Sequence, residues 1–377
     1  MGWMPDYQDL DPVRLAPEWS ADELGRARAV SKLLEFRKAF AEGAEMPPAR
    51  RLDSLLIGTW NLREFDSTTW GARVPETYAY IAEIIDRFDL VALQEVRADL
   101  RALERLMVRL GPRWRYLVSD VTRGKAGNSE RLAFVYDTSK VQFLGMAGEL
   151  VLPPLERDGK AVPVQQVART PLMAAFQVGW TKFVLATVHI LFGPDSPEPL
   201  ARVEEIRQVA RFLRERVDDP DEPTRNFIVL GDFNIFSESD ATMRALTEDG
   251  GFSVPEGVTR IPGTNVPRDK KYDQIAFRSA GGFFQATGAA GAFDFYNHVF
   301  TGDDADTYRQ YIDAYISARA AAGHRSPKPP TSASGALTQF KMWRTYQMSD
   351  HLPLWAEFRV DFTDDYLTQA LSRPPTP

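Results

Sequence analysis

From about residue 52 onward, short apolar runs alternate with longer amphipathic stretches. Apolar runs of about four to eight residues are typical of strands, and apolar residues spaced three and four apart are typical of helices. The pattern therefore predicts strands at 54–60, 90–94, 116–119, 131–136, 172–178, 183–189, 227–230, 274–277 and 351–358. It predicts helices at 75–87, 100–110, 200–217 and 240–247.

The spacing of these strands indicates the kind of sheet. Strands 172–178 and 183–189 follow one another too closely for a helix to lie between them. Parallel neighbours need a crossover of a dozen or so residues, whereas antiparallel neighbours need only a tight turn. We therefore expect an α/β (α+β) protein whose sheets are mixed or antiparallel.

Three segments lie outside this alternation. Residues 1–50 are predicted to be an N-terminal helical extension, with Ser20 as N-cap and Glu23 completing a capping box. Residues 279–341 are predicted to be an insertion near the active site. It begins Gly/Ala-rich, contains a helix at 303–322 and a Pro/Ser-rich loop, and then returns directly to strand. Residues 361–377 form a C-terminal tail, and 51–360 form the main domain.

Polar residues stand at the ends of six predicted strands. Each alone is compatible with a turn former, a helix cap, a loop acid or a satisfied core histidine. Strands hold side chains rigidly, however, and polar groups gathered at the rim of a sheet are how binding and catalytic sites are built. Together they predict a site composed of Asn61, Glu95, His189, Asp232 with Asn234, Asp273, and Asp350 with His351.

Composition narrows the chemistry of that site. The 377 residues include four histidines and no cysteine, so disulfides, thiolate metal sites and a reactive thiol are excluded. Asn and Glu offer oxygen ligands, which suit a hard cation such as Mg²⁺ better than zinc. With no Gly-rich phosphate loop, the set favours metal-assisted hydrolysis of a phosphate ester.

Charge and hydropathy bear on partners and location. The formal net charge is −7, so any nucleic-acid binding must depend on local basic patches. The N-terminus lacks the basic and apolar regions of a signal peptide, and no apolar run is long enough for a membrane span. We therefore expect a cytoplasmic protein. The oligomeric state stays open.

The order Asn, Gln-Glu, His, Gly-Asp-x-Asn, Tyr-Asp and Ser-Asp-His resembles the endonuclease/exonuclease/phosphatase superfamily over about residues 52–360. Within it the chain is most similar to the deoxyribonuclease I group, through "NLREF", "QEVR", "GNSERLAFVYD", "VARTP", "GDFN" and "YDQI". The resemblance implies a four-layered α/β/β/α sandwich of two packed mixed sheets.

The resemblance also implies roles for individual residues. Asn61 and Glu95 would hold Mg²⁺ or Mn²⁺. Asp350 would belong to the metal site or contact a metal ligand or a histidine from behind. His189, oriented by Glu130, and His351, oriented by Asp273, would be the acid–base pair, in an order that the sequence leaves open. Asp232 would orient or deprotonate the attacking water, and Asn234 would bind the phosphate. Arg97 would contact the minor groove and Arg169 a phosphate.

These observations predict a divalent-metal-dependent phosphodiesterase, a nuclease acting on DNA or another nucleic acid. The chain departs from that group at Asn128 and Ser129, which replace a stacking tyrosine. This departure and the acidic net charge favour an alternative: a phosphatase or a phospholipase-type hydrolase, sphingomyelinase-like or acting on inositol phosphates. A third alternative is a catalytically dead binding protein. The complete set of polar site residues argues against it.

Overall fold

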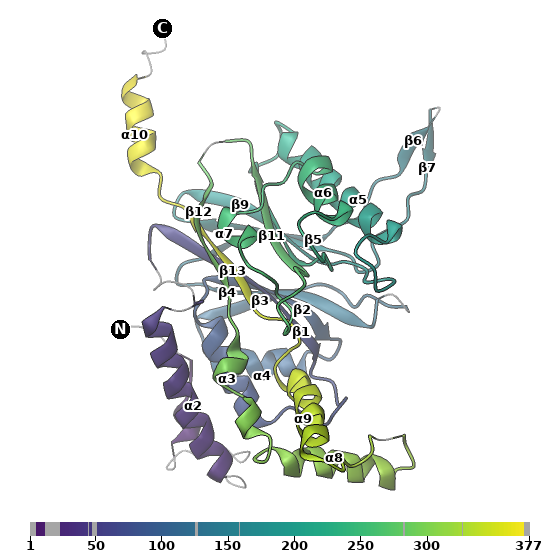
Figure 1. The fold of residues 1–377 in the computed structure, drawn as a ribbon. Coiled ribbons are helices and arrows are strands. Elements are labelled where there is room, and N and C mark those ends of the chain that lie inside the picture. Colours follow the sequence, from purple (N-terminus) through teal and green to yellow (C-terminus); the bar gives the residue numbers. More distant parts are fainter. Residues whose placement is uncertain are drawn as a thin grey trace.

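The computed structural model describes residues 5–11, 23–43, 45–46, 51–124, 127–157, 159–281, 283–325 and 327–372. Two packed sheets form its centre (Figure 1). The six-stranded sheet has the order β12 (Gln285–Ala292), β13 (Leu354–Arg359), β1 (Ser54–Phe65), β2 (Leu90–Arg97), β4 (Glu130–Asp137) and β3 (Trp114–Val118). The five-stranded sheet has the order β11 (Asp273–Ser279), β10 (Asn226–Asp232), β9 (Thr181–His189), β8 (Leu172–Val178) and β5 (Gln142–Glu149).

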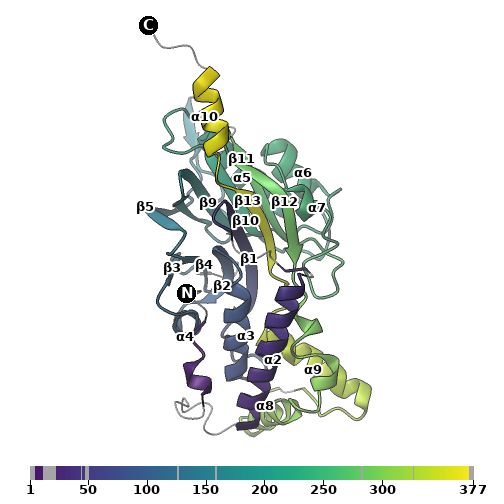
Figure 2. The ribbon, with the colours of Figure 1, turned by 90° about the vertical axis from the view of Figure 1, so that its left-hand side faces the viewer.

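Helices cover the outer face of each sheet, so the predicted four-layered sandwich is confirmed (Figures 1 and 2). Below the six-stranded sheet in Figure 1 lie α2 (Glu23–Glu42), α3 (Pro75–Ile85) and α4 (Arg101–Leu110). Above the five-stranded sheet lie α5 (Leu200–Asp218) and α6 (Ala241–Arg244). Helix α6 continues into a π-helical turn at Ala245–Asp249. Helix α7 (Glu256–Thr259) packs near β12. Both sheets are mixed: β1 with β2 and β9 with β10 are parallel, and the other pairs are antiparallel.

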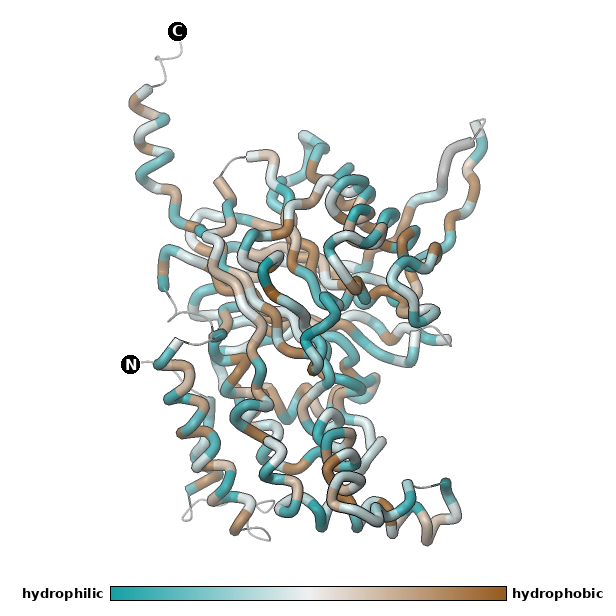
Figure 3. Tube along the Cα trace, viewed as in Figure 1, coloured by the Kyte–Doolittle hydropathy of each residue, from teal (hydrophilic) through white to brown (hydrophobic). Residues whose placement is uncertain are grey.

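The strands of the five-stranded sheet alternate between two cores, because successive side chains point to opposite faces. In β8, Ala174 and Phe176 join the core between the sheets, whereas Met173 and Ala175 join the core under α5. The same alternation in β10 separates Ile228 and Leu230 from Phe227 and Val229. Figure 3 shows the apolar strands gathered in the middle of the molecule.

The segment that follows β11 differs from the sequence prediction in two places. Strand β12 lies within it and pairs with β13, so these Gly/Ala-rich residues belong to the six-stranded sheet. The expected direct return to strand is wrong, because a second helix, α9 (Ala333–Gln347), comes first. The Ser332 side chain caps that helix by accepting a hydrogen bond from Gly335 N. The helix expected at 303–322 is α8 (Arg309–Ala321).

The N-terminal helix α2 packs against segments far away in the sequence. Phe36 contacts Tyr80 of α3 and Phe293, with ring centroids 5.8 Å and 5.7 Å apart. Arg28 donates hydrogen bonds to the buried Glu76 of α3 and to the hydroxyl of Tyr308. The capping box expected at Ser20 lies outside the described residues, and the proposed domain division stays a prediction.

Smaller elements project from the sandwich. The hairpin of β6 (Leu155–Arg157) and β7 (Lys160–Val162) extends from the right-hand side of Figure 1, and α10 (Thr363–Ser372) extends from the top. Short 3-10 turns occur at Gln8–Leu10, Phe295–Asn297 and Gly302–Asp304. Among the residues that the structure describes, no helix combines the length and the apolar character needed to cross a bilayer.

Candidate active site

Three polar side chains lie next to each other at one end of the five-stranded sheet. The sheet register places Asp232, the last residue of β10, opposite His189 on one side and Asp273 on the other. Asp232 follows Ile228 and Leu230 at two-residue spacing, so it points toward the six-stranded sheet. All three residues are at most 5% exposed.

The six-stranded sheet contributes Asn61 from β1 and Glu95 from β2 at the facing position. Asn61 Nδ2 donates hydrogen bonds to Glu95 Oε1 at 2.8 Å and to Asp232 Oδ2 at 3.1 Å. The second contact crosses from one sheet to the other. Glu95 Oε2 also accepts a hydrogen bond from Glu64 N at 2.7 Å, which fixes the carboxylate.

Each histidine of the site lies between two carboxylates. His189 Nδ1 is 2.6 Å from Glu130 Oε1, and His189 Nε2 is 3.6 Å from Asp232 Oδ2. His351 Nδ1 is 2.8 Å from Asp273 Oδ2, and His351 Nε2 is 3.7 Å from the same Asp232 oxygen. Both imidazoles are therefore oriented through Nδ1 and present Nε2 to one common point.

Burial and charge act in opposite directions on these imidazoles. Burial by itself lowers the pKa of His189. The charge of Glu130, its hydrogen bond to the ring and the charge of Asp232 outweigh burial and raise the pKa above its ordinary value. Burial likewise opposes protonation of His351, and the charges of Asp273 and Asp232 raise its pKa well above the ordinary value. Both imidazoles are thus biased toward the protonated form.

A polar layer lies directly beneath the site and joins the two sheets. Gln94 Nε2 donates to Thr59 Oγ1 at 3.1 Å and to Thr187 Oγ1 at 3.0 Å. Thr59 is two residues before Asn61, and Thr187 is two residues before His189, so each threonine points to the same face as that site residue. The completely buried Gln94 therefore fixes the spacing of the sheets just where the site begins.

The backbone is strained where the site side chains leave their strands. Glu95 has φ +60° and Asn234 has φ +53°, conformations that are uncommon for residues other than glycine and that concentrate at functional sites. Gly231 has φ +136°, and a Cβ there would lie 2.1 Å from Val188 O. Only glycine lets β10 approach β9 closely enough to place Asp232 beside His189.

The remaining predicted residues lie around this centre. Asn234 is buried and donates a hydrogen bond from Nδ2 to Ile190 O at 2.8 Å. Asp350 is 42% exposed at its side chain and forms an ion pair with Arg63 at 3.1 Å. Arg169 is buried, with Nε 2.5 Å from Glu130 Oε1. Arg97 is exposed at the end of β2 and pairs in register with Glu130.

Two sets of groups could hold a divalent cation. Asp232, Asp273 and His351 present ligand atoms within 4.8 Å of one another. Asn61, Glu95 and Asp232 bring two carboxylates and an amide to one place. Asn61 Nδ2 links the two carboxylates of the second set, and Asn61 Oδ1 accepts a hydrogen bond from Arg63 N. A hard cation such as Mg²⁺ prefers oxygen ligands, so Glu95 and Asp232 would hold it there, with the amide turned to present its oxygen.

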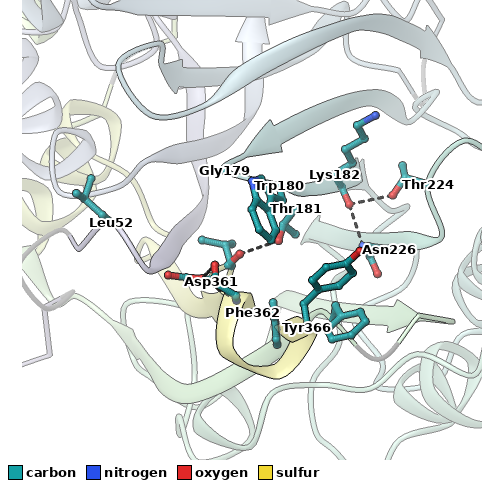
Figure 4. Close-up of a pocket in the computed structure, with 13 residues that line it drawn as sticks. Leu52, Gly179, Trp180, Thr181, Lys182, Thr224, Asn226, Asp361, Phe362 and Tyr366 are labelled. Carbon is teal, nitrogen blue, oxygen red and sulfur yellow. Dashed lines mark hydrogen bonds between the residues drawn. The ribbon is translucent and has the colours of Figure 1, made fainter. Parts of the chain in front are cut away.

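A separate cavity of about 510 Å³ lies at the opposite end of the strands. It is lined by Thr181 and Lys182 at the start of β9, by Asn226 at the start of β10, and by Trp180 and Tyr366 (Figure 4). His189 and Asp232 stand at the other ends of these two strands. The cavity is therefore not part of the candidate active site.

Sequence reasoning missed two arginines that support the site from behind, Arg73 and Arg202. Both are buried, and both donate hydrogen bonds to backbone carbonyls next to site residues. Arg202 belongs to the apolar face of α5, together with Val203, Ile206 and Val209. A charged residue on the buried face of an amphipathic helix was the signal that could have identified it.

Comparison with known proteins matches the chain to a family model and to a curated protein. The model of the endonuclease/exonuclease/phosphatase family matches residues 58–304. A curated protein named "Deoxyribonuclease", from Thioalkalivibrio sp. (strain K90mix), is 30% identical over 235 residues, which are 60% of this chain. The match spans only 58% of the length of that relative.

Solved structures share the fold at low sequence identity. An endonuclease/exonuclease/phosphatase family protein from Bacteroides thetaiotaomicron superposes with a TM-score of 0.51 and 19% identity, covering 82% of this chain and 96% of the other. A conserved protein of unknown function from Enterococcus faecalis V583 gives 0.50 and 17%, covering 81% and 100%. At these identities the likeness concerns the fold alone.

Proposed function

Because the chain belongs to the endonuclease/exonuclease/phosphatase family, we propose that it is a divalent-metal-dependent phosphodiester hydrolase and that its substrate is a nucleic acid, DNA in particular. One observation carries the proposal: Asp232 Oδ2 is approached by Asn61 Nδ2 and by Nε2 of both His189 and His351. Two imidazoles and a candidate cation site thus meet at the carboxylate of Asp232, an arrangement that suits acid–base and metal-assisted hydrolysis of a phosphate ester.

Each side chain has a task that its surroundings suit. Asp232 would orient the attacking water and accept its proton. His351, held protonated by Asp273 and Asp232, would donate a proton to the leaving oxygen, while His189 would contact the phosphate. Asn61 and Glu95 would hold Mg²⁺ or Mn²⁺, with Asp350 nearby. When bound, the cation would neutralise phosphate charge in the transition state.

An aromatic surface beside His351 supports a nucleic-acid substrate. The rings of Phe192, Phe236 and Tyr272 contact one another, and Tyr272 also packs on the His351 ring at 5.6 Å between centroids. Phe192 is 37% exposed, and Lys270 Nζ lies 4.0 Å from the centre of the Phe236 ring. An exposed ring on a supporting aromatic cluster, with a cation nearby, suits the stacking of bases and the binding of phosphates. The relative named as a deoxyribonuclease supports the same proposal.

The test is hydrolysis of a panel of substrates with Mg²⁺ or with EDTA. We expect plasmid or single-stranded DNA to be cleaved only with the metal, and phosphomonoesters and sphingomyelin to be hydrolysed far more slowly. His351→Ala should lower the rate by about 10²–10⁴-fold, the usual contribution of acid–base assistance. His324→Ala, at an exposed histidine, is the matched control and should keep the parent rate.

The panel also tests the competing activity. The net charge of −7 favours a small or lipid phosphate ester over a polyanion. Phosphate release from a monoester, or cleavage of sphingomyelin, with DNA left intact would replace the nuclease proposal by a phosphatase or phospholipase-type activity. If no phosphate ester is hydrolysed and calorimetry detects no Mg²⁺ binding, the hydrolase proposal itself is wrong.

A further inference from the structure

Two buried arginines bind backbone carbonyl oxygens instead of carboxylates. Arg202 is 0% exposed and donates five hydrogen bonds, to Leu191 O, Phe192 O, Pro194 O, Ser196 O and Asn234 O. Arg73 is 4% exposed and donates four, to Leu62 O, Arg63 O, Gln347 O and Met348 O. Its nearest ion pair, to Asp66, is long at 4.0 Å.

Each guanidinium joins two chain segments that carry site residues. Arg202 connects the loop that follows His189 with the backbone of Asn234, at 2.9 Å from Nη1 to Asn234 O. Arg73 connects the residues after Asn61 with those before His351, at 2.6 Å from Nη2 to Leu62 O and 2.7 Å from Nε to Gln347 O. The planar fork of an arginine fixes several acceptors in one geometry, which a lysine cannot do.

The two arginines occupy corresponding places in the two halves of the sandwich. Each sheet contains a parallel pair joined through a crossover helix: β1 and β2 through α3, and β9 and β10 through α5. Arg73 lies two residues before the start of α3, and Arg202 is the third residue of α5. Each therefore lies behind the strand ends that carry Asn61 and Asp232.

Helix α5 holds the same loop by a second group. Glu205, one turn after Arg202, accepts hydrogen bonds from Leu191 N at 3.0 Å and from Ala168 N at 3.2 Å. The loop after His189 is thus bound through its carbonyls by Arg202 and through an N–H by Glu205. The contact with Ala168 extends this support to the residue before Arg169.

Burying an arginine without a close carboxylate lowers the stability of the fold, because the charge loses its hydration. Burial lowers the pKa of Arg202, and the negative charge of Asp232 acts in the opposite direction. An apolar side chain at these positions would avoid this desolvation penalty. It would, however, leave the loop carbonyls without hydrogen-bond donors. The strained backbone of Asn234 needs such external support, because residues with positive φ persist only where their surroundings hold them.

We propose, building on the hydrolase function proposed above, that Arg202 and Arg73 are positioning residues of the reaction, one for each sheet. Arg202 fixes the backbone around His189 and Asn234, and Arg73 fixes the backbone around Asn61 and His351. Neither guanidinium contacts the substrate. Each acts by holding the side chains that surround Asp232 in their relative positions, to which phosphoryl-transfer rates are sensitive.

Chemical rescue separates positioning from general stability. Arg202→Ala should lower kcat on a short DNA substrate by about 10²-fold, the cost of a displacement on the order of 1 Å. KM for DNA should rise as well, because the guanidinium also lies 5.1 Å from the centres of the Phe192 and Phe236 rings. Millimolar guanidinium should bind in the vacated space and restore part of kcat, whereas methylammonium, which has the charge but not the planar fork, should not. Arg73→Ala should show the same loss and rescue of kcat.

The matched control is Arg225→Ala. Arg225 donates to Val217 O at 2.7 Å, so it also binds carbonyls of α5, but at the end of the helix away from the site. It should lower the melting temperature and leave kcat unchanged, with no response to guanidinium. If Arg202→Ala does not fold, Arg202→Lys takes its place, and a parent-level kcat in that variant would contradict the proposal.

A measurement without substrate distinguishes this proposal from the proposed function. The imidazole NMR signal of His189 in metal-free protein should shift in Arg202→Ala, return with guanidinium, and stay unchanged in Arg225→Ala. An inactive parent protein with this shift would refute the hydrolase function and still show that Arg202 holds the His189 ring in place. An unchanged signal, or an unchanged kcat in an active and folded Arg202→Ala, would refute the positioning role.

Discussion

At the scale of single residues, three carboxylates surround two imidazoles and differ in which ring nitrogen they face. Glu130 and Asp273 each touch the Nδ1 atom of one histidine, whereas Asp232 faces Nε2 of both. In the proposed hydrolysis, the outer carboxylates would set the orientation and charge of the rings, and Asp232 would face the reacting groups. This division of roles requires that each outer carboxylate raise the pKa of its own histidine.

The pKa of His189 tests that requirement. Glu130→Gln removes the main interaction that raises the pKa, while the burial that lowers it remains, so the pKa of His189 should fall. The sign follows because the protonated imidazole loses its partner and the neutral form does not. NMR titration of the imidazole signals in metal-free protein measures this directly, since the chain has only four histidines.

His298 provides the internal control for that titration. It packs against Phe293 and Phe36, and burial lowers its pKa, so the substitution at Glu130 should leave its titration unchanged. A rise in the pKa of His189, or no change, would mean that Glu130 orients the ring without controlling its charge.

At the scale of elements, the close approach of β9 and β10 decides where Asp232 lies. Gly231→Ala would place a Cβ 2.1 Å from Val188 O at a backbone with φ +136°. The strands must separate, and we expect the free energy of unfolding to fall by about 2 kcal/mol or more. Activity should fall further than stability accounts for, because Asp232 moves away from His189.

Gly148→Ala is the matched control for this strand contact. Gly148 lies in β5, where an added Cβ meets no atom within 4 Å. Urea denaturation and kcat of both variants give the comparison, and Gly148→Ala should match the parent protein. Equal stability in Gly231→Ala would show that β9 and β10 tolerate a wider spacing than the structure has.

The elements that the sequence predicted well are those with a clear apolar pattern. The run at 172–178 is the strand β8, and 200–217 is nearly the whole of α5. Strand β12 was missed because its sequence, QATGAAGA, has few strand-forming residues and gains its place by pairing with β13. Ser and Gly residues precede the apolar part of α9 and favour a loop in the sequence, although Ser332 caps the helix.

At the scale of the whole molecule, the sequence predicts the residues of the candidate site but not the contacts that hold them there. The motifs identified Asp232 and His351 because these residues have characteristic neighbours in the chain. The contacts of Arg73 and Arg202 are with backbone carbonyls, which carry no side-chain signature. The Gln94 contact between sheets also depends on how the two sheets pack, which no local pattern specifies.

The packing of α2 ties the N-terminal segment to the rest of the molecule. Phe36 is completely buried among Phe40, Tyr80, Phe293 and His298. Phe36→Ala would leave a cavity in this cluster and should lower the free energy of unfolding by about 3–5 kcal/mol. The kcat of the folded variant should stay at the parent value, because the rings around Phe36 belong to α2, α3 and 293–298 and not to the site.

Leu34→Ala, on the exposed side of the same helix, is the control and should change stability little. Urea denaturation followed by tryptophan fluorescence and by far-ultraviolet circular dichroism should give one coincident transition for Phe36→Ala, because α2 shares its core with the six-stranded sheet. Two separate transitions, with the first leaving activity intact, would instead show that residues 23–42 unfold as an independent extension. In that case the aromatic cluster would dock the helix without contributing to the stability of the sandwich.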